Sequence, residues 1–152
     1  MAAVRSATVT WQGDLAKGSG TVSAGTSGTF QDLPVSWSSR TESPDGRTSP
    51  EELLAAAHSS CFAMALSAEL GRAGTPPEHL HVEAEVTFDK RDAGWTVVSS
   101  RLTVLGHVPG ATHASFTEAA ETTRVGCPIS RALAGNVELS VQATLEDEDH
   151  EH

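Results

Sequence analysis

Apolar and polar residues alternate in several short stretches of this chain, and a period of two is typical of half-buried β-strands. Some of these stretches precede a long helical pattern and others follow it. Asp92-Ala93-Gly94 has the composition of a tight turn, so the stretches on either side of it are predicted to form an antiparallel hairpin. We expect strands at residues 6–12, 20–23, 29–30, 33–38, 79–89, 95–107 and 137–145.

The clearest helical pattern covers residues 50–72. Ser49 is a suitable N-cap, Pro50 fits the first helical position, and Glu52 lies three residues after the cap, as in a capping box. Gly74, followed by two prolines, predicts where the helix ends. An apolar stripe at helical spacing is expected to pack inward and to carry a cysteine with it: Leu53, Leu54, Ala57, Cys61, Met64, Ala65 and Ala68.

Two shorter helices are expected at residues 113–124 and 128–134, before the last strand. Strands, a long helix, a hairpin, short helices and a final strand define an α+β protein with mainly antiparallel sheets. No linker interrupts the pattern, so residues 1–145 are predicted to form a single domain. Residues 146–152 are predicted to be an acidic, disordered tail.

The net charge of −10 over 152 residues argues against nucleic acid as a partner, because no cluster of Lys and Arg is present to neutralise phosphates. The chain starts without a secretory signal and has no uninterrupted apolar run of membrane-spanning length, so a membrane partner is not expected. Two cysteines in such a chain suggest the reducing cytoplasm, where a disulfide is usually transient and catalytic.

Cys61 and Cys127 are the strongest candidates for chemistry, because a thiolate is the best nucleophile near neutral pH. A single cysteine on an apolar helix face is more often inert packing. Cys61 lies about three turns into its helix, beyond the reach of the helix dipole, so a reactive thiolate there needs a cation from elsewhere. Arg40, in the preceding loop, is the first candidate and Arg47 the second.

A catalytic arginine would need a carboxylate to orient it, and Glu51 and Glu52 both stand at the start of the long helix. Cys127 precedes Pro128 and is a candidate N-cap, where backbone N–H groups can stabilise a thiolate. On local electrostatics Cys127 is the better nucleophile. The residues alone therefore leave open which glutamate acts and which thiol attacks.

The histidines offer weaker signals. His58 precedes Cys61 by one helical turn and suggests a Cys–His nucleophile, although a partly exposed helix histidine is the favoured interpretation. The remaining histidines show no spacing typical of a metal site, so no metal is expected at His79, His81, His107 or His113, nor at the terminal His150-Glu-His152.

Three segments together resemble the OsmC branch of the OsmC/Ohr family of peroxidases. Two of them are its cysteine motifs, Thr48-Ser-Pro-Glu-Glu-Leu-Leu-Ala-Ala-Ala-His-Ser-Ser-Cys-Phe-Ala-Met-Ala-Leu66 and Val125-Gly-Cys-Pro-Ile-Ser-Arg-Ala-Leu133. The third is the opening Val9-Thr-Trp-Gln-Gly-Asp-Leu-Ala-Lys-Gly-Ser-Gly-Thr-Val-Ser23. The similarity runs in a consistent order over residues 5–145.

The resemblance implies an intertwined homodimer with antiparallel sheets around long central helices and active sites at the subunit interface. It implies reduction of organic hydroperoxides, and less well of hydrogen peroxide, without a cofactor and with a dithiol or lipoyl-type reductant. Carried over by motif, Cys61 is the peroxidatic thiol and Cys127 the resolving thiol. Arg40 matches the catalytic arginine and Glu51 its carboxylate partner. Phe62, Met64 and Trp37 are candidates for an apolar substrate pocket, or else ordinary core residues.

Two other functions are compatible with the same residues. One is a binding module without catalysis, whose groove holds an apolar or acyl ligand and is merely lined by the cysteines. The other is an acyl-transfer hydrolase that uses Cys61 with His58 and has no role for Cys127.

Overall fold

The computed structural model describes residues 1–147 and contains two compact units, Met1–Leu53 and the chain from Leu54 onward. The single domain expected over residues 1–145 stays a prediction. Most of the acidic tail expected at 146–152 lies outside the described residues.

The first unit holds a three-stranded antiparallel sheet of β1 (Ala7–Gln12), β2 (Ser19–Ala24) and β3 (Leu33–Val35), in that order. The strand expected at 29–30 is not formed, and the strand expected at 33–38 stops early. Ser36 instead caps a short helix, α1 (Trp37–Thr41), by exchanging side-chain–backbone hydrogen bonds with Ser39. A serine replaces the usual Glu or Gln of a capping box here, and that weaker pattern hid the helix.

The long helix α2 (Pro50–Arg72) begins and ends where the sequence predicts. The Ser49 hydroxyl accepts a hydrogen bond from the Glu52 N–H at 3.1 Å. The Glu52 carboxylate accepts from the Thr48 hydroxyl at 2.7 Å, so only half of the expected capping box is present. After the last turn, Gly74 adopts a φ of +88°, a left-handed conformation that favours glycine and ends the helix.

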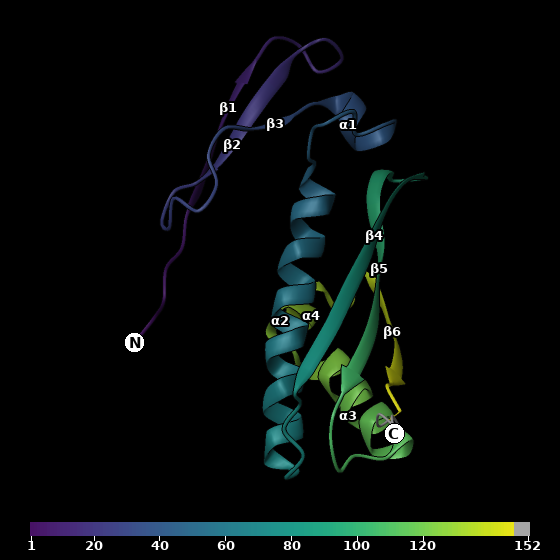
Figure 1. The fold of residues 1–152 in the computed structure, drawn as a ribbon. Coiled ribbons are helices and arrows are strands. Elements are labelled where there is room, and N and C mark those ends of the chain that lie inside the picture. The colour runs from purple at the N-terminus through teal and green to yellow at the C-terminus, as the bar shows by residue number, and fades with distance from the viewer. Residues whose placement is uncertain (148–152) are drawn as a thin grey trace. The chain divides into compact units, whose positions relative to one another are not determined.

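In the second unit, three strands form a sheet in the order β4 (His79–Arg91), β5 (Gly94–His107) and β6 (Glu138–Leu145). β4 and β5 are the predicted antiparallel hairpin. The chain then passes through α3 (His113–Gly126) and α4 (Pro128–Leu133) and returns as β6, which pairs parallel to β5 (Figure 1). A crossover through helices is the usual route to a parallel neighbour. The α+β class with mostly antiparallel sheets is confirmed.

The β4–β5 hairpin contains a β-bulge that shifts its register by one residue. Thr87 pairs with Ser99, whereas Phe88 pairs with Val97, so Val98 has no partner of its own. Beyond the bulge, His79 lies opposite His107. An unbulged hairpin would have placed His79 opposite Gly106, since each pair in that half would move by one residue.

The core of the second unit lies between this sheet and the helices. It is made of Phe62, Leu66, Leu70, Leu102, Val104, Val108, Phe116, Ala119, Ala120 and Cys127. α2 therefore buries the row His58, Phe62, Leu66 and Leu70, spaced by four residues. Small or apolar residues occupy more than one face of α2, so its sequence pattern did not identify the face that packs.

The prediction that this apolar stripe of α2 packs inward is wrong for several of its residues. Ala57 and Ala68 are exposed, and the Met64 side chain is 72% exposed. Cys61 is half-buried at the edge of this stripe. The second unit therefore presents apolar helix surface, including Met64, at its exterior.

By length and composition alone, α2 is also long and apolar enough to cross a membrane. One helix of this kind is weak evidence, because helices in the cores of water-soluble proteins meet the same criterion. The expected absence of a membrane partner stays a prediction.

Candidate active site

The two cysteines, far apart in the sequence, are brought into contact by the second unit. The Cys127 thiol donates a hydrogen bond to Cys61 Sγ, and the two sulfurs are 3.1 Å apart. The two sulfurs are not joined by a disulfide. A disulfide has an S–S bond of about 2.05 Å, so a movement of about 1 Å would join them.

Local sequence explains where Cys127 lies. A residue before proline is disfavoured in the helical conformation, and Cys127 is extended, with φ −58° and ψ 134°. It therefore ends α3 and, as predicted, occupies the N-cap of α4. Its sulfur makes no capping hydrogen bond, however, and contacts Cys61 instead.

The thiols of Cys61 and Cys127 differ in their exposure to solvent. Cys127 is 1% exposed, whereas Cys61 is half-buried and faces a hollow of about 570 Å³. The hollow is almost wholly apolar and is lined by Ala57, Ser60, Cys61, Met64, Ala65, Pro128 and Ile129. Met64 is therefore placed beside the thiol as expected, whereas Phe62 belongs to the core. A bulky reagent in the hollow meets Cys61 first.

The second unit does not itself activate Cys61. Burial raises the pKa of the Cys61 thiol, and its neighbour Cys127 raises it further. The backbone N–H of Ile129 and the positive charge of Arg131 lower it, but the net shift of the pKa is upward. A reactive thiolate at this position therefore requires an additional cation.

His58 has a different environment from the one expected. It is fully buried, and burial lowers its pKa below the ordinary value of 6.5. Nδ1 lies 2.7 Å from the Ser100 hydroxyl and Nε2 lies 2.9 Å from the Ser130 hydroxyl. The expectation of a partly exposed side chain is wrong, because these serines, which the sequence analysis did not single out, satisfy both ring nitrogens.

This network connects α2 to β5 through Ser100 and to α4 through Ser130. Since α4 begins directly after Cys127, the contact between His58 on α2 and Ser130 on α4 helps to hold the Cys127 thiol next to Cys61. Both nitrogens of His58 are engaged by serines, so the ring is not placed to act as the base of a Cys61 hydrolase.

Arg40 and Glu51 form the second pair of candidate residues, and both belong to the first unit. Arg40 Nε lies 3.0 and 3.1 Å from the two Glu51 carboxylate oxygens, and Nη2 lies 3.0 Å from Oε2. Glu51 is 7% exposed. The Arg40 guanidinium also lies 5.8 Å from the centre of the Trp37 ring. A buried carboxylate held by such a fork fixes the guanidinium in one orientation.

Arg47 and Glu52, the alternative candidates, lie in different environments from Arg40 and Glu51. Arg47 is exposed, and the Glu52 carboxylate bonds to Thr48. Arg40 itself comes from the last turn of α1, the helix that the sequence did not reveal. Contact therefore favours Arg40 over Arg47 and Glu51 over Glu52.

Arg40 lies at the wall of an apolar hollow of about 340 Å³ within the first unit. The lining is Val9, Trp11, Leu15, Val22, Val35, Ser36, Trp37, Arg40, Pro50 and Leu53. Val9, Trp11 and Leu15 are exposed despite being large and apolar. Trp37 is thus part of an apolar pocket, as one of the two sequence interpretations expected.

The expectation that the strand histidines lack ligand partners is wrong for His79 and His107. Their rings stack with centroids 5.4 Å apart, and both rings lie close to the Glu146 carboxylate. The β4–β5 register that brings them together was not visible in the residue spacing.

Several known proteins are similar to this chain in sequence and in fold. The family model described as "OsmC-like protein" matches residues 43–142. Peroxiredoxin OsmC of Escherichia coli is 39% identical over 132 residues, which cover 87% of this chain and 91% of that protein. YmaD of Bacillus subtilis, an uncharacterised protein, is 28% identical over 68% of this chain and 72% of its own length.

Solved structures show the same fold at lower identity. An organic hydroperoxide resistance protein from Elizabethkingia anophelis superposes with a TM-score of 0.74 at 24% identity, covering 96% of this chain and 100% of that one. An OsmC-like protein from Mycoplasma pneumoniae gives 0.72 at 16% identity over 95% and 99%. This chain is thus an enzyme of the peroxiredoxin type. It belongs to the OsmC-like family, as its two cysteine motifs indicated.

Proposed function

We propose that this enzyme reduces organic hydroperoxides to alcohols, with Cys61 as the peroxidatic thiol and Cys127 as the resolving thiol. The observation that carries the proposal is the 3.1 Å contact between the two sulfurs, of which Cys61 is the more exposed. Two thiols in contact can be oxidised to a disulfide, with the loss of two electrons. The peroxiredoxin name of the relative from E. coli supports a peroxide as the oxidant.

In the first step, the Cys61 thiolate attacks the distal oxygen of the hydroperoxide. A sulfur–oxygen bond forms while the O–O bond breaks, and the leaving alkoxide takes a proton and departs as the alcohol. Cys61 is left as sulfenic acid. The Arg40 guanidinium, held by Glu51, stabilises the thiolate and the developing negative charge on the oxygens.

In the second step, Cys127 attacks Cys61 Sγ, the sulfenic hydroxyl leaves as water, and a Cys61–Cys127 disulfide forms. A dithiol or lipoyl-type reductant then supplies two electrons and two protons to restore both thiols. The reaction uses no cofactor, and we place it in the reducing cytoplasm, where such reductants act.

The complete site requires a homodimer in this proposal, with the Arg40–Glu51 pair and the thiol pair meeting at the subunit interface. Two observations support it. The pKa of Cys61 is raised within its own unit, so the thiolate depends on a cation supplied from outside. The apolar stripe of α2 beside Cys61, with Met64 largely exposed, is suited to cover by a second subunit.

The substrate preference follows from the hollows beside the candidate residues. The one next to Cys61 is lined almost entirely by apolar atoms, and so is the one next to Arg40. Burial of a hydrocarbon chain against apolar walls makes the free energy of binding more favourable, whereas hydrogen peroxide has no hydrocarbon to bury. Alkyl and aryl hydroperoxides should therefore react with a higher kcat/KM than hydrogen peroxide.

The experiment that tests the proposal is a count of thiols in the reduced protein after one equivalent of cumene hydroperoxide, with peptide mapping by mass spectrometry. Loss of both thiols to a Cys61–Cys127 disulfide supports it. Two intact thiols would overturn it and favour a module that binds an apolar ligand without redox chemistry. Cys61→Ser is the matched control and should leave Cys127 unoxidised.

A further inference from the structure

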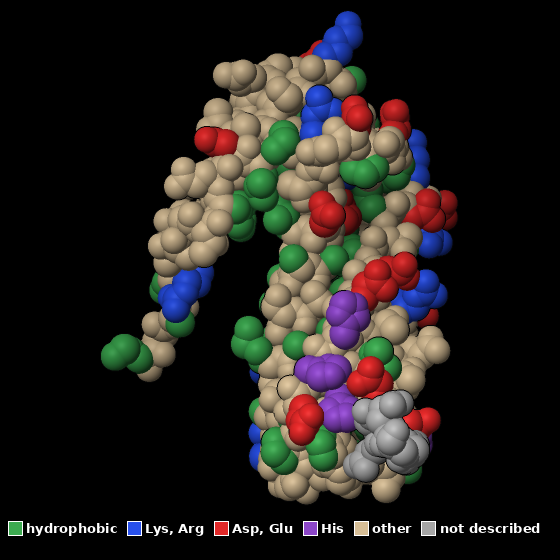
Figure 2. Space-filling view, in the orientation of Figure 1, with side chains coloured by type: hydrophobic (Ala, Val, Ile, Leu, Met, Phe, Trp, Pro, Cys, Tyr) green, Lys and Arg blue, Asp and Glu red, His purple; other side chains and the backbone are tan. Residues whose placement is uncertain are grey.

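The outer face of the second sheet carries a group of side chains that the peroxidase reaction does not use. His79, His107 and Glu146 stand on β4, on β5 and directly after β6, the three neighbouring strands of the sheet. Figure 2 shows histidine side chains gathered beside acidic ones on this part of the surface. Their arrangement is a consequence of strand register.

The backbone places all three residues on one rung of the sheet. His79 lies directly opposite His107 in the antiparallel pair. Gly106 is level with Leu145 in the parallel pair, and the Glu146 N–H donates to the Gly106 carbonyl at 2.8 Å, so Glu146 follows beside His107. Side chains on one rung point to the same face. The strand register thus places the three side chains on the same face of the sheet at the same level.

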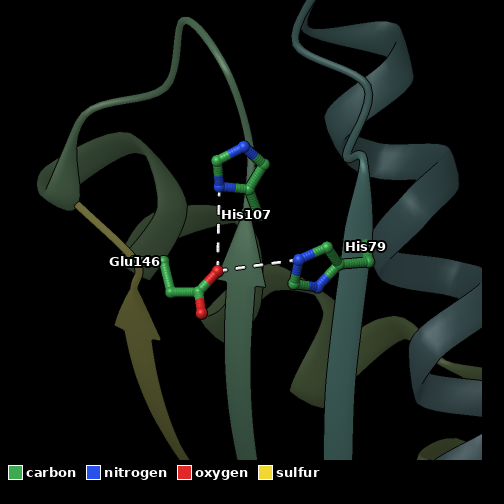
Figure 3. Close-up of side chains that lie close together, drawn as sticks. All are labelled: His79, His107 and Glu146. Atoms are coloured by element: carbon green, nitrogen blue, oxygen red, sulfur yellow. Dashed lines mark ion pairs between the residues drawn. The ribbon is translucent and has the colours of Figure 1, made fainter. Parts of the chain in front are cut away.

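The donor atoms are close enough to share one ion. Glu146 Oε1 lies 3.7 Å from His79 Nε2 and 3.7 Å from His107 Nδ1, so one carboxylate oxygen faces a nitrogen of each ring (Figure 3). The three ligand atoms all lie within 4.8 Å of one another. In a tetrahedral zinc site, ligand atoms are about 3.3 Å apart, because each is about 2.0 Å from the ion. Small rotations of exposed side chains would close the remaining difference.

Glu78 adds a carboxylate that can orient one of the two histidines. Its Oε1 lies 3.2 Å from His107 Nε2, the ring nitrogen that does not face Glu146. A carboxylate on the far nitrogen of a ligating histidine fixes the ring orientation and strengthens the other nitrogen as a ligand. His107 is therefore held with Nδ1 directed at Glu146.

We propose that His79, His107 and Glu146 bind a divalent first-row transition-metal ion of the zinc type. Two imidazoles and a carboxylate suit such an ion, whereas calcium and magnesium prefer a shell of oxygens. A hollow of about 320 Å³ adjoins His107 and Glu146 and is also lined by His113 and Asp147, which leaves room for a water or a further ligand. The ion would join the ends of three strands.

The test is zinc binding to the full-length reduced chain, measured by isothermal titration calorimetry. His79→Ala, His107→Ala and Glu146→Gln should each weaken binding by at least tenfold, and Glu78→Gln by about tenfold, the usual effect of losing an orienting carboxylate. His81→Ala is the matched control, because His81 is exposed on the same face but lies opposite Leu105, two rungs away. It should leave the affinity unchanged.

Two other sources of zinc binding are separated by variants. The thiol pair is removed by Cys61→Ser/Cys127→Ser, and the terminal histidines by His150→Ala/His152→Ala. The proposal requires a site that survives both changes, and a cobalt(II) derivative whose absorption spectrum has no sulfur-to-metal charge-transfer band. Loss of all binding in either double variant, or equal affinity in His79→Ala, His107→Ala and wild type, would overturn it. Metal-free melting curves of each variant establish that the variant is folded.

Discussion

Cys127 donates a hydrogen bond to Cys61 across 3.1 Å, although 66 residues separate the two in the chain. One thiol is buried at the junction of α3 and α4, and the other opens onto an apolar hollow. This asymmetry supports the different roles proposed for the two chemically identical side chains. The half-buried Cys61 is the sulfur that a peroxide in the hollow would meet, whereas the buried Cys127 is in contact with Cys61.

Replacing each thiol should therefore give a different defect. Cys61→Ser should reduce peroxide no faster than the uncatalysed reaction, because the attacking sulfur is gone. Cys127→Ser should complete one turnover and then stop with Cys61 as sulfenic acid. Stopped-flow measurement of peroxide consumption, with dimedone trapping and mass spectrometry, distinguishes the two. Sustained turnover by Cys61→Ser would contradict the assignment.

Arg40 should matter far more than Arg47. Arg40→Ala should lower kcat/KM for cumene hydroperoxide by about 100-fold, the usual scale for losing one stabilising donor. Glu51→Gln should produce a smaller loss, since the guanidinium would remain but lose its orienting carboxylate. Arg47→Ala is the matched control and should stay within about twofold of wild type. A severe defect in Arg47→Ala with an active Arg40→Ala would reverse the choice.

The apolar stripe of α2 should be an interface. A Met64→Glu substitution places a charge where an apolar contact is proposed, and such a charge is costly to bury without a partner. The variant should shift from dimer to monomer in size-exclusion chromatography with light scattering. Gln142→Glu, on the exposed face of β6, adds the same charge away from the stripe and should stay dimeric. An unchanged mass for Met64→Glu, or a monomeric wild type, would remove the interface from α2.

His58 should make stability depend on pH. Its folded-state pKa is lowered by burial, so the folded protein resists protonation that the unfolded chain accepts. Its contribution is complete above about pH 6.5 and decreases as the pH falls below that value through the folded pKa. Urea unfolding between pH 5 and pH 8 should show a free energy of unfolding that drops toward acid.

The control for this pH effect is His58→Asn, which cannot take up the proton. The variant should be less stable at pH 8, by about 1–3 kcal/mol, because Ser100 and Ser130 lose hydrogen-bond partners. Its free energy of unfolding should also fall less steeply below pH 6.5. An identical acid dependence in both proteins would assign the effect to other groups.

Local chemistry accounts for what the sequence determined by itself. The bounds of α2 follow from Ser49, Pro50 and Gly74, all of which act within one or two turns of the helix ends. The β4–β5 hairpin follows from alternation and a turn. The two cysteine motifs were sufficient to indicate the family, which the comparisons confirm.

Tertiary structure decided the remainder, because contacts between distant segments leave no periodic signal. α2 is apolar on more than one face, so only packing against the sheet shows that Phe62 is buried and Met64 exposed. His58 is buried because Ser100 and Ser130, from other elements, satisfy its ring. A single bulge after Thr87 sets which residue faces His79. Strand register depends on one inserted residue, and its effect falls on side chains many positions away.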